Sequence, residues 1–237
     1  MIGGETPAQA GGYPLPEYHS ISKGLKYGRV EIKDIPLIYH VLLVDLTEPG
    51  VEVRPIRARG RDETIEKMSS RILALGEPLL AAVNGDYFKP ATKTDFLPWG
   101  ILVEDAALIF SPTDKSGFIL GKDGKPLITV PDFKADVSFA GSKKKYRVLS
   151  VNRPLKIDRG ECCLFTRGWD TSIPEYEDGF AVTISAGAKV ANGLIHGKVV
   201  GVLRMPVGVT IPEDGYVLIF SDFFGSPLLK PDLGEPA

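Results

Sequence analysis

The sequence predicts an α+β fold that consists mainly of antiparallel sheet with few helices. Short apolar runs recur roughly every ten residues with turn dipeptides between them, a spacing typical of antiparallel strands rather than of strand–helix–strand units. Only residues of about 63–75 carry a helical pattern. With 237 residues and 43% hydrophobic content, the chain can also bury a sizeable core.

Residues 1–17 are expected to form a flexible leader. Glycine and proline are frequent there and large apolar side chains are few, so the segment cannot bury enough surface to offset the entropy of ordering. Residues 18–237 contain no linker rich enough in Pro, Gly or Ser to divide them. We therefore expect one domain there, with the basic run Lys143–Lys145 as a weak candidate boundary.

Residues 37–46 form a continuous apolar and β-branched run, the pattern of a strand covered on both faces. The turn dipeptide Pro49-Gly50 follows, and residues 51–57 come next. The simplest expectation is an antiparallel hairpin of these two runs, with residues 37–46 as a central strand.

The helical segment carries apolar residues at spacings of three, four and three, which predicts an amphipathic helix with its stripe on the sheet. These residues are Ile65, Met68, Ile72 and Leu75. Asp62 or Thr64 is the expected N-cap, and Gly76 is the expected stop. The short apolar run Leu79–Val83 then predicts a buried strand. Farther on, Asp123-Gly124 predicts a hairpin with a type I′ turn.

Asn84, Gly85 and Asp86 follow the expected strand and form the first candidate site. A small residue lets the backbone approach a ligand, while Asn84 and Asp86 offer an amide and a carboxylate at the end of a rigid element. The alternative is a plain Asn-Gly turn, with Tyr87 and Phe88 in the core. Both interpretations stay open on these residues alone.

Three further positions are candidates for substrate binding. Trp99, between Pro and Gly at a strand entrance, suits sugar stacking, with plain packing as the alternative. Arg153 lies at a strand end beside a turn-forming Pro, where its planar fork can grip a phosphate; an ordinary surface arginine is the alternative. Thr171 belongs to a loop cluster of aromatic, hydroxyl and carboxylate groups that suits carbohydrate.

The composition excludes several function classes. The 28 basic and 30 acidic side chains give no broad positive field for nucleic acid, and no stretch approaches the ~18 apolar residues of a membrane span.

Cys162 and Cys163 are adjacent in an apolar run, which predicts buried thiols, with a vicinal disulfide as the alternative. No spacing predicts a metal site, and no cofactor is expected.

The order of the segments is more informative than any one of them. The ordered motifs are Ile21-Ser-Lys-Gly-Leu-Lys-Tyr-Gly, His40-Val-Leu-Leu-Val-Asp-Leu, Ala81-Ala-Val-Asn-Gly-Asp-Tyr-Phe, Pro98-Trp-Gly-Ile-Leu-Val, Phe118-Ile-Leu-Gly-Lys-Asp-Gly, Asn152-Arg-Pro, Leu164-Phe-Thr and Ile211-Pro-Glu-Asp-Gly-Tyr-Val-Leu. Over about residues 18–220 the chain resembles the phosphodiester glycosidase family. Its most specific motif is the strand followed by Asn-Gly-Asp-Tyr-Phe, in which Asp86 replaces the glycine commoner in the family.

This resemblance implies a hydrolase that cleaves a sugar from a phosphodiester at the anomeric carbon, on glycans or cell-envelope polymers. It implies an extracytoplasmic or secreted protein, although the first residues lack the pattern of a signal peptide. By position, Asp86 and Asn84 are the implied catalytic residues, and Gly85 lines the same cleft. Arg153 and Thr171 are weaker carry-overs. One carboxylate, Asp86, is enough because phosphate is a good leaving group.

The sequence also departs from the family pattern. The family's Arg-x-Ala-x-Gly strand and its later Asp-Gly-Gly-Gly-Ser segment do not occur in this sequence. One expectation is therefore a family domain whose C-terminal part is missing, so that an exposed sheet edge would associate with something. The alternative function is a non-catalytic carbohydrate- or partner-binding module that keeps the scaffold, with Trp99 and Trp169 as platforms.

Overall fold

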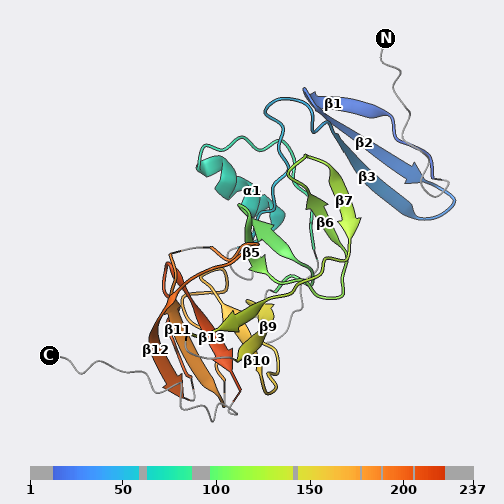
Figure 1. Ribbon diagram of the computed structural model, residues 1–237. Coiled ribbons are helices and arrows are strands. Elements are labelled where there is room, and N and C mark those ends of the chain that lie inside the picture. The colour runs from blue at the N-terminus through green and yellow to red at the C-terminus, as the bar shows by residue number, and fades with distance from the viewer. Residues whose placement is uncertain are drawn as a thin grey trace. The chain divides into compact units, whose positions relative to one another are not determined.

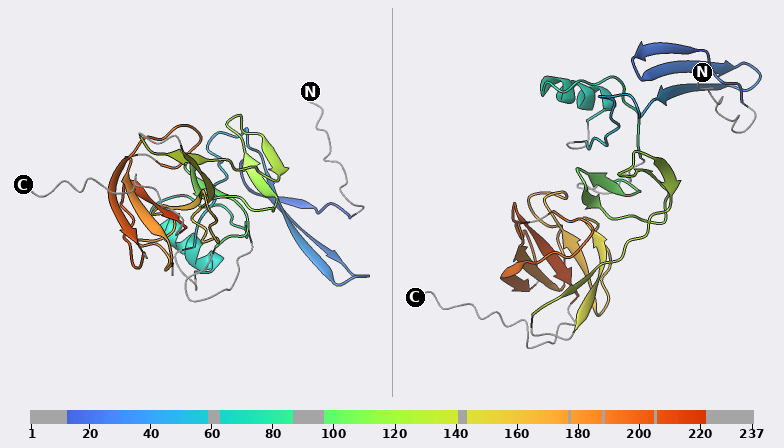
Figure 2. Two further views of the ribbon diagram at one scale, coloured as in Figure 1. Left: turned by 60° about the horizontal axis from the view of Figure 1, so that its bottom comes forward. Right: turned by 45° about the horizontal axis from the view of Figure 1, so that its top comes forward.

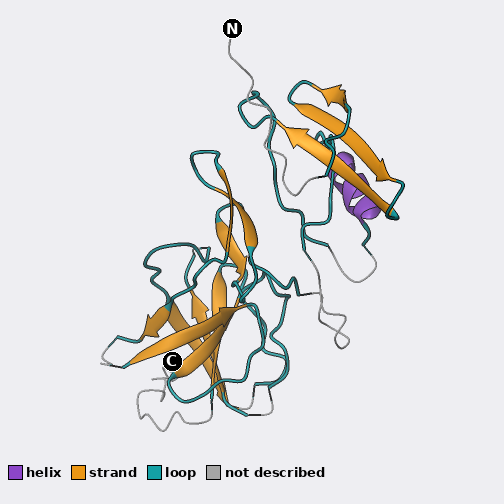
Figure 3. Cartoon of the chain, turned by 90° about the vertical axis from the view of Figure 1, so that its right-hand side faces the viewer, coloured by secondary structure: helices purple, strands orange, loops and turns teal. Residues whose placement is uncertain are grey.

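The structure is a computed structural model, and it forms two compact units, each of which is described by itself. It describes residues 13–58, 63–86, 97–140, 144–176, 178–187, 189–204 and 206–221. One unit contains β1, β2, β3 and α1, and the other contains β4 to β13 (Figure 1). The predicted fold class is confirmed, because the described part has one helix and mainly antiparallel strands (Figure 3). No described helix has the length and apolar character needed to span a membrane.

The first unit contains a three-stranded antiparallel meander in the order β1-β2-β3. Its strands are β1 (Tyr18–Ser22), β2 (Leu25–Ile32) and β3 (Leu37–Val44). β2 pairs with all of β3, from Leu25 opposite Val44 to Ile32 opposite Leu37. β3 is therefore an edge strand of the described sheet, and three of its eight residues are exposed while none is buried. The expectation that this run is a central strand covered on both faces is wrong.

The predicted hairpin between residues 37–46 and 51–57 is also wrong, because residues 51–58 form no strand. The chain leaves β3 through a turn that Asp45 stabilises: its Oδ1 accepts hydrogen bonds from the Thr47 amide at 2.9 Å and the Thr47 hydroxyl at 2.7 Å. Val51 then donates its amide to the Glu48 carbonyl at 3.1 Å rather than to a strand partner. β2, which sequence reasoning did not pair with β3, supplies the antiparallel neighbour instead.

The described end of the expected leader lies against this sheet. Pro16 is buried, and a Cβ added to Gly28 would come within 2.5 Å of its ring. Tyr39 donates its hydroxyl to the Pro14 carbonyl, and its ring meets Tyr13 edge to face at a centroid distance of 6.4 Å. Residues 1–12 of the expected leader lie outside the described residues.

The predicted helix is confirmed as α1 (Ile65–Ala74), with Ile72 buried. It ends in a Schellman motif at Gly76, which has φ of +79°. The Glu77 amide donates to the Ile72 carbonyl at 3.4 Å, and the Gly76 amide donates to the Leu73 carbonyl at 3.0 Å. Asp62, one of the two expected N-caps, lies outside the described residues.

The expected buried strand over Leu79–Val83 is wrong. These residues are irregular, and Val83 is 76% exposed. A short apolar run becomes a buried strand only where a neighbouring strand pairs with it, and no described strand pairs with this one.

The second unit begins with two hairpins. β4 (Leu102–Glu104) and β5 (Ala107–Phe110) are joined through Asp105 and Ala106, whose φ values of 49° and 58° make a type I′ turn. β6 (Gly117–Leu120) and β7 (Pro126–Thr129) confirm the hairpin predicted at Asp123-Gly124. The predicted turn type is wrong there, because Gly124 has positive φ and Asp123 does not. The Asp123 carboxylate accepts the Lys125 amide at 3.2 Å and so stabilises a wider loop.

A six-stranded sheet in the order β12-β11-β13-β10-β9-β8 makes up the rest of this unit (Figure 2). Its strands are β8 (Asp136–Ser138), β9 (Lys145–Val151), β10 (Glu161–Phe165), β11 (Phe180–Ser185), β12 (Lys198–Arg204) and β13 (Gly215–Phe220). Neighbouring strands are antiparallel except β9 and β10, which run parallel and are connected by residues 152–160. Every residue of β13 is buried, so this strand lies in the core of this unit.

Both faces of this sheet are packed. One cluster includes Cys163, Phe165 and Ile219, and the other includes Cys162, Tyr146 and Phe220. The prediction of buried thiols is confirmed, because Cys162 and Cys163 are fully buried and form no disulfide. Burial raises the pKa of both thiols. For Cys162 the neighbouring Cys163 adds a second, smaller upward effect on the pKa.

Candidate functional site

The corner that ends β9 organises the candidate site. Asn152 has φ of +54° and is completely buried, and this left-handed turn directs Arg153 away from the strand. The side chain of Arg153 is also buried, and the residue is 8% exposed. We call residues 152 and 153 the β9 corner. It contributes to two polar networks, one through each residue.

The Arg153 guanidinium bonds to three backbone carbonyls. Its Nε donates to the Ser111 carbonyl at 2.8 Å and one Nη donates to the Pro98 carbonyl at 2.8 Å. The other Nη donates to the Gly100 carbonyl. The cation also lies over the Phe110 ring, 5.6 Å from its centroid. Arg153 thereby ties the end of β5 to residues 98–100, which we call the Trp99 turn.

Asp86 also bonds to the Trp99 turn. Its Oδ2 accepts a hydrogen bond from the Gly100 amide at 2.6 Å. Gly100 is buried, and a Cβ added to it would lie 3.1 Å from this oxygen, so the carboxylate approaches closely because residue 100 has no side chain. Burial lowers the pKa of Arg153, while the negative charge of Asp86 acts in the opposite direction. The carboxylate and the buried cation therefore share one electrostatic environment.

Trp99 is the middle residue of this turn, and it is 41% exposed. Its carbonyl accepts the Thr113 hydroxyl at 2.7 Å. All three carbonyls of the Trp99 turn thus accept bonds from side chains distant in the sequence, Arg153 and Thr113. A backbone held at each residue presents its partly exposed indole in a fixed place, which suits an aromatic binding platform.

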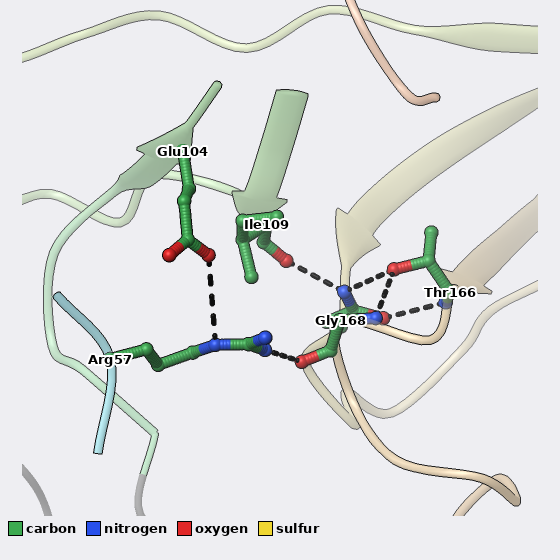
Figure 4. Close-up of polar contacts among 6 residues, drawn as sticks. Arg57, Glu104, Ile109, Thr166 and Gly168 are labelled. Carbon is green, nitrogen blue, oxygen red and sulfur yellow. Dashed lines mark hydrogen bonds and ion pairs between the residues drawn. The ribbon is translucent and has the colours of Figure 1, made fainter. Parts of the chain in front are cut away.

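The second network surrounds Asn152, and Figure 4 labels the residues Ile109, Thr166 and Gly168 that take part in it. Its Nδ2 donates to the Ile109 carbonyl at 2.7 Å and to the Thr166 hydroxyl at 2.7 Å. Its Oδ1 accepts the Thr166 amide at 2.7 Å. The Thr166 hydroxyl also accepts the Gly168 amide at 2.9 Å. This side chain therefore links β5 to the loop that follows β10.

Arg57 extends this network from another part of the chain. It donates to the Gly168 carbonyl, and its Nε lies 3.9 Å from the Glu104 carboxylate in β4 (Figure 4). The network is structural in character, because its bonds join backbone segments to one another. It stabilises the β9 corner through Asn152, while Arg153 of the same corner holds the Trp99 turn.

The structure brings some of the predicted site residues together. Asp86 and Arg153 meet at the Trp99 turn, and Asn84 and Gly85, both exposed, directly precede Asp86. Thr171 is exposed, and its backbone bonds to Asp170 Oδ1 at 2.6 Å and to the Ile211 amide at 2.8 Å. These bonds place it beside the Ser172–Thr210 bridge. Tyr87 and Phe88 lie outside the described residues.

Trp169, the other expected platform, is part of the core. It is partly buried and meets Phe165 edge to face at a centroid distance of 5.5 Å. Gly100, Thr113 and Ser111 were not singled out from the sequence. The glycine of the Pro-Trp-Gly tripeptide was a usable indication, because glycine permits a close approach to the backbone. Nothing in the sequence connects Thr113 or Ser111 with this turn.

Comparison with known proteins gives the fold and no function. No protein-family model matches the sequence, and no curated protein matches it. The crystal structure of a hypothetical protein from Synechocystis is similar, with a TM-score of 0.67 and 15% sequence identity. The likeness covers 92% of this chain and 39% of that one, so the chain spans about two fifths of the length of its structural neighbour. At this identity the likeness extends to the fold alone.

Proposed function

We propose that the protein is a phosphodiester glycosidase that hydrolyses sugar phosphodiester linkages on glycans or cell-envelope polymers outside the cytoplasm, with its site at Asp86 and the Trp99 turn. The observation that carries the proposal is the hydrogen bond from the Gly100 amide to Asp86, at 2.6 Å, beside a partly exposed tryptophan. A carboxylate held at a fixed position can stabilise the oxocarbenium-like centre of sugar cleavage, and a partly exposed tryptophan nearby can bind the sugar.

The chemistry assigns a role to each residue. The bond from the anomeric carbon to the phosphate oxygen breaks, and the phosphate departs as an anion that needs little acid assistance. Water forms the new bond to the anomeric carbon, and the proton that it loses passes to solvent. Asp86 stabilises the positive charge that develops at the anomeric carbon. Asn84 binds a sugar hydroxyl through its amide, Gly85 lets the substrate approach the backbone, and Trp99 stacks on the ring. Thr171 keeps a weaker assignment as a substrate-binding residue.

One observation favours the alternative of a carbohydrate-binding module without catalysis. The hydrogen bonds described for the Arg153 guanidinium all go to backbone carbonyls, so this cation is engaged in holding the Trp99 turn. A well-anchored, partly exposed tryptophan can bind sugar without any reaction following.

The test is release of free sugar from a UDP-sugar and from a synthetic α-sugar phosphodiester. The parent protein is expected to release sugar, while Asp86→Asn and Asn84→Ala should lower kcat/KM at least about 100-fold. Asp114→Asn is the matched control, because Asp114 is an exposed carboxylate that forms an ion pair with its neighbour Lys115.

The outcomes separate the two functions. Turnover that is unchanged in Asp86→Asn and Asn84→Ala sinks the residue assignment. Sugar binding that Trp99→Ala abolishes and Asp86→Asn retains, with no turnover by the parent protein, establishes the binding module instead. Binding is measured by calorimetry with the same sugar phosphodiester.

A further inference from the structure

We propose that Arg153 is a positioning residue that acts through the backbone of the Trp99 turn and sets the places of Asp86 and Trp99 together. This inference rests on the proposed function for its kinetic part only. It replaces the sequence-based expectation that the Arg153 fork grips the phosphate of a substrate.

The first step is the cost of burying the guanidinium. A cation that is 8% exposed loses most of its hydration, and that loss is tolerated only where the cation is well bonded or near a negative charge. Three carbonyls and the Phe110 ring satisfy it here, and Asp86 is the charge that favours the cationic form. A side chain so engaged is committed to its protein partners.

The second step is that Gly100 couples Arg153 to Asp86. The Gly100 carbonyl accepts the guanidinium, and the Gly100 amide donates to the carboxylate. The two bonds leave the same residue, so a shift of the guanidinium moves the donor that holds Asp86. Because Gly100 is buried and a Cβ there would crowd Asp86 Oδ2 at 3.1 Å, the coupling has little slack.

The third step concerns Trp99. The planar fork spans the carbonyls on either side of it, at Pro98 and Gly100, while Thr113 holds the carbonyl of Trp99 itself. A lysine at position 153 would keep the charge but could not bridge carbonyls at both ends of the turn, because its ammonium is a point donor. Charge and geometry can therefore be separated by one substitution.

The experiment uses a Trp169→Phe background, in which Trp99 is the one remaining tryptophan of the two in the chain. In Arg153→Lys we expect the Trp99 emission maximum and its acrylamide quenching to change in the free protein, and kcat on the sugar phosphodiester to fall about 10- to 100-fold. KM should change less than kcat. Arg147→Lys is the matched control, because Arg147 is an exposed arginine of β9, the strand that leads to Arg153.

A second pair of variants tests the anchoring of Trp99 if Arg153→Lys does not fold. Thr113→Val removes one hydroxyl at an exposed residue and should shift Trp99 emission in the same direction, while Thr113→Ser should restore it. Thermal unfolding measures whether each variant is folded.

Three results overturn the proposal. They are unchanged Trp99 emission in folded Arg153→Lys, a rise of KM alone with kcat intact, and unchanged emission in Thr113→Val. The KM result would mean that Arg153 binds substrate directly. If the parent protein turns over no sugar phosphodiester, the proposed function fails, and the emission measurements still decide the positioning role.

Discussion

Asn152 and Thr166 exchange a pair of hydrogen bonds: the Asn152 amide nitrogen donates to the Thr166 hydroxyl, and the Thr166 backbone amide donates to Asn152 Oδ1, both at 2.7 Å. The pair joins the end of β9 to the end of β10, two strands that run parallel. Asn152 also has φ of +54° and is fully buried. The same residue therefore forms the turn that ends β9 and supplies the hydrogen bonds of a buried polar network.

We expect Asn152→Ala to be among the most destabilising substitutions in the second unit. It removes three side-chain hydrogen bonds and leaves buried polar groups unpaired. It also puts alanine at a positive φ, where a side chain that cannot form a local hydrogen bond is disfavoured. The expected combined loss in the free energy of unfolding is about 3–5 kcal/mol. Asn152→Gly relieves the backbone strain but restores no bond, so it should lose less. Equal losses in urea unfolding of the two variants would show that strain contributes nothing.

Gly168→Ala should disturb the same network by crowding. An added Cβ would lie 2.9 Å from Asn152 Nδ2 and 2.9 Å from the Thr166 hydroxyl, closer than Cβ atoms normally approach. We expect a loss of about 1–3 kcal/mol, the usual cost of overpacking. Gly50→Ala does not serve as a control because Gly50 has φ of +85°, whereas Gly201→Ala does, since its nearest neighbour would lie at 3.7 Å. A Gly168→Ala variant as stable as Gly201→Ala would contradict the described packing.

Gly100→Ala should displace Asp86. The new Cβ would lie 3.1 Å from Asp86 Oδ2, so the carboxylate must move by a few tenths of an ångström and lengthen its bond to the residue 100 amide. If the proposed function holds, kcat should fall about tenfold or more, with a small effect on unfolding. Turnover at the parent rate, measured on the same sugar phosphodiester, would show that Asp86 does not need this donor.

Stability should fall at alkaline pH. Burial raises the pKa of Cys162 and Cys163 in the folded state, so their contribution is fully present below the unfolded thiol pKa of about 8.5 and is lost as pH rises toward the folded values. Each thiol should cost about 1.4 kcal/mol per pH unit in that window. Urea unfolding between pH 7 and 10 measures the slope. Cys162→Ala should lower this slope by the contribution of one thiol. A slope identical to that of the parent protein would show that the thiols do not cause it.

The outer strand β12 should limit solubility. It is an edge of the described six-stranded sheet, and its Val199, Val200 and Leu203 are exposed, Val200 by 55%. Such an edge invites pairing with other strands. We expect Val200→Lys to raise the concentration at which light scattering detects association, at a cost below about 1 kcal/mol in stability. Val182→Lys, at a buried position of the neighbouring strand, should unfold the protein instead.

Local patterns predicted the elements whose formation depends on nearby residues. The spacing of Ile65, Met68 and Ile72 with Gly76 behind them predicted α1 to within two residues, because both the stripe and the stop are local. The hairpin around Asp123-Gly124 was predictable for the same reason. The fold class followed from the strand spacing.

The failures concern pairing between segments, which periodicity does not encode. The pattern of residues 37–46 predicted a central strand. In the structure β3 pairs with β2 on one side only, and no strand of the described sheet pairs with its other side. The apolar run Leu79–Val83 likewise predicted a buried strand, although Val83 is exposed, because the run does not show whether a partner strand is present. At the site, Asp86 and Arg153 were predictable from residue type, whereas their meeting through Gly100 depends on three-dimensional contacts across 14 and 53 positions of the chain.

Cys162 and Cys163 give this protein a built-in pair of reporters. They are consecutive residues of one strand, yet one belongs to each of the two core clusters. A thiol reagent reaches a fully buried cysteine only when its surroundings open, so the labelling rates of Cys162→Ala and Cys163→Ala variants measure the opening of each sheet face separately. A ligand that tightens only one face would slow one rate and leave the other unchanged.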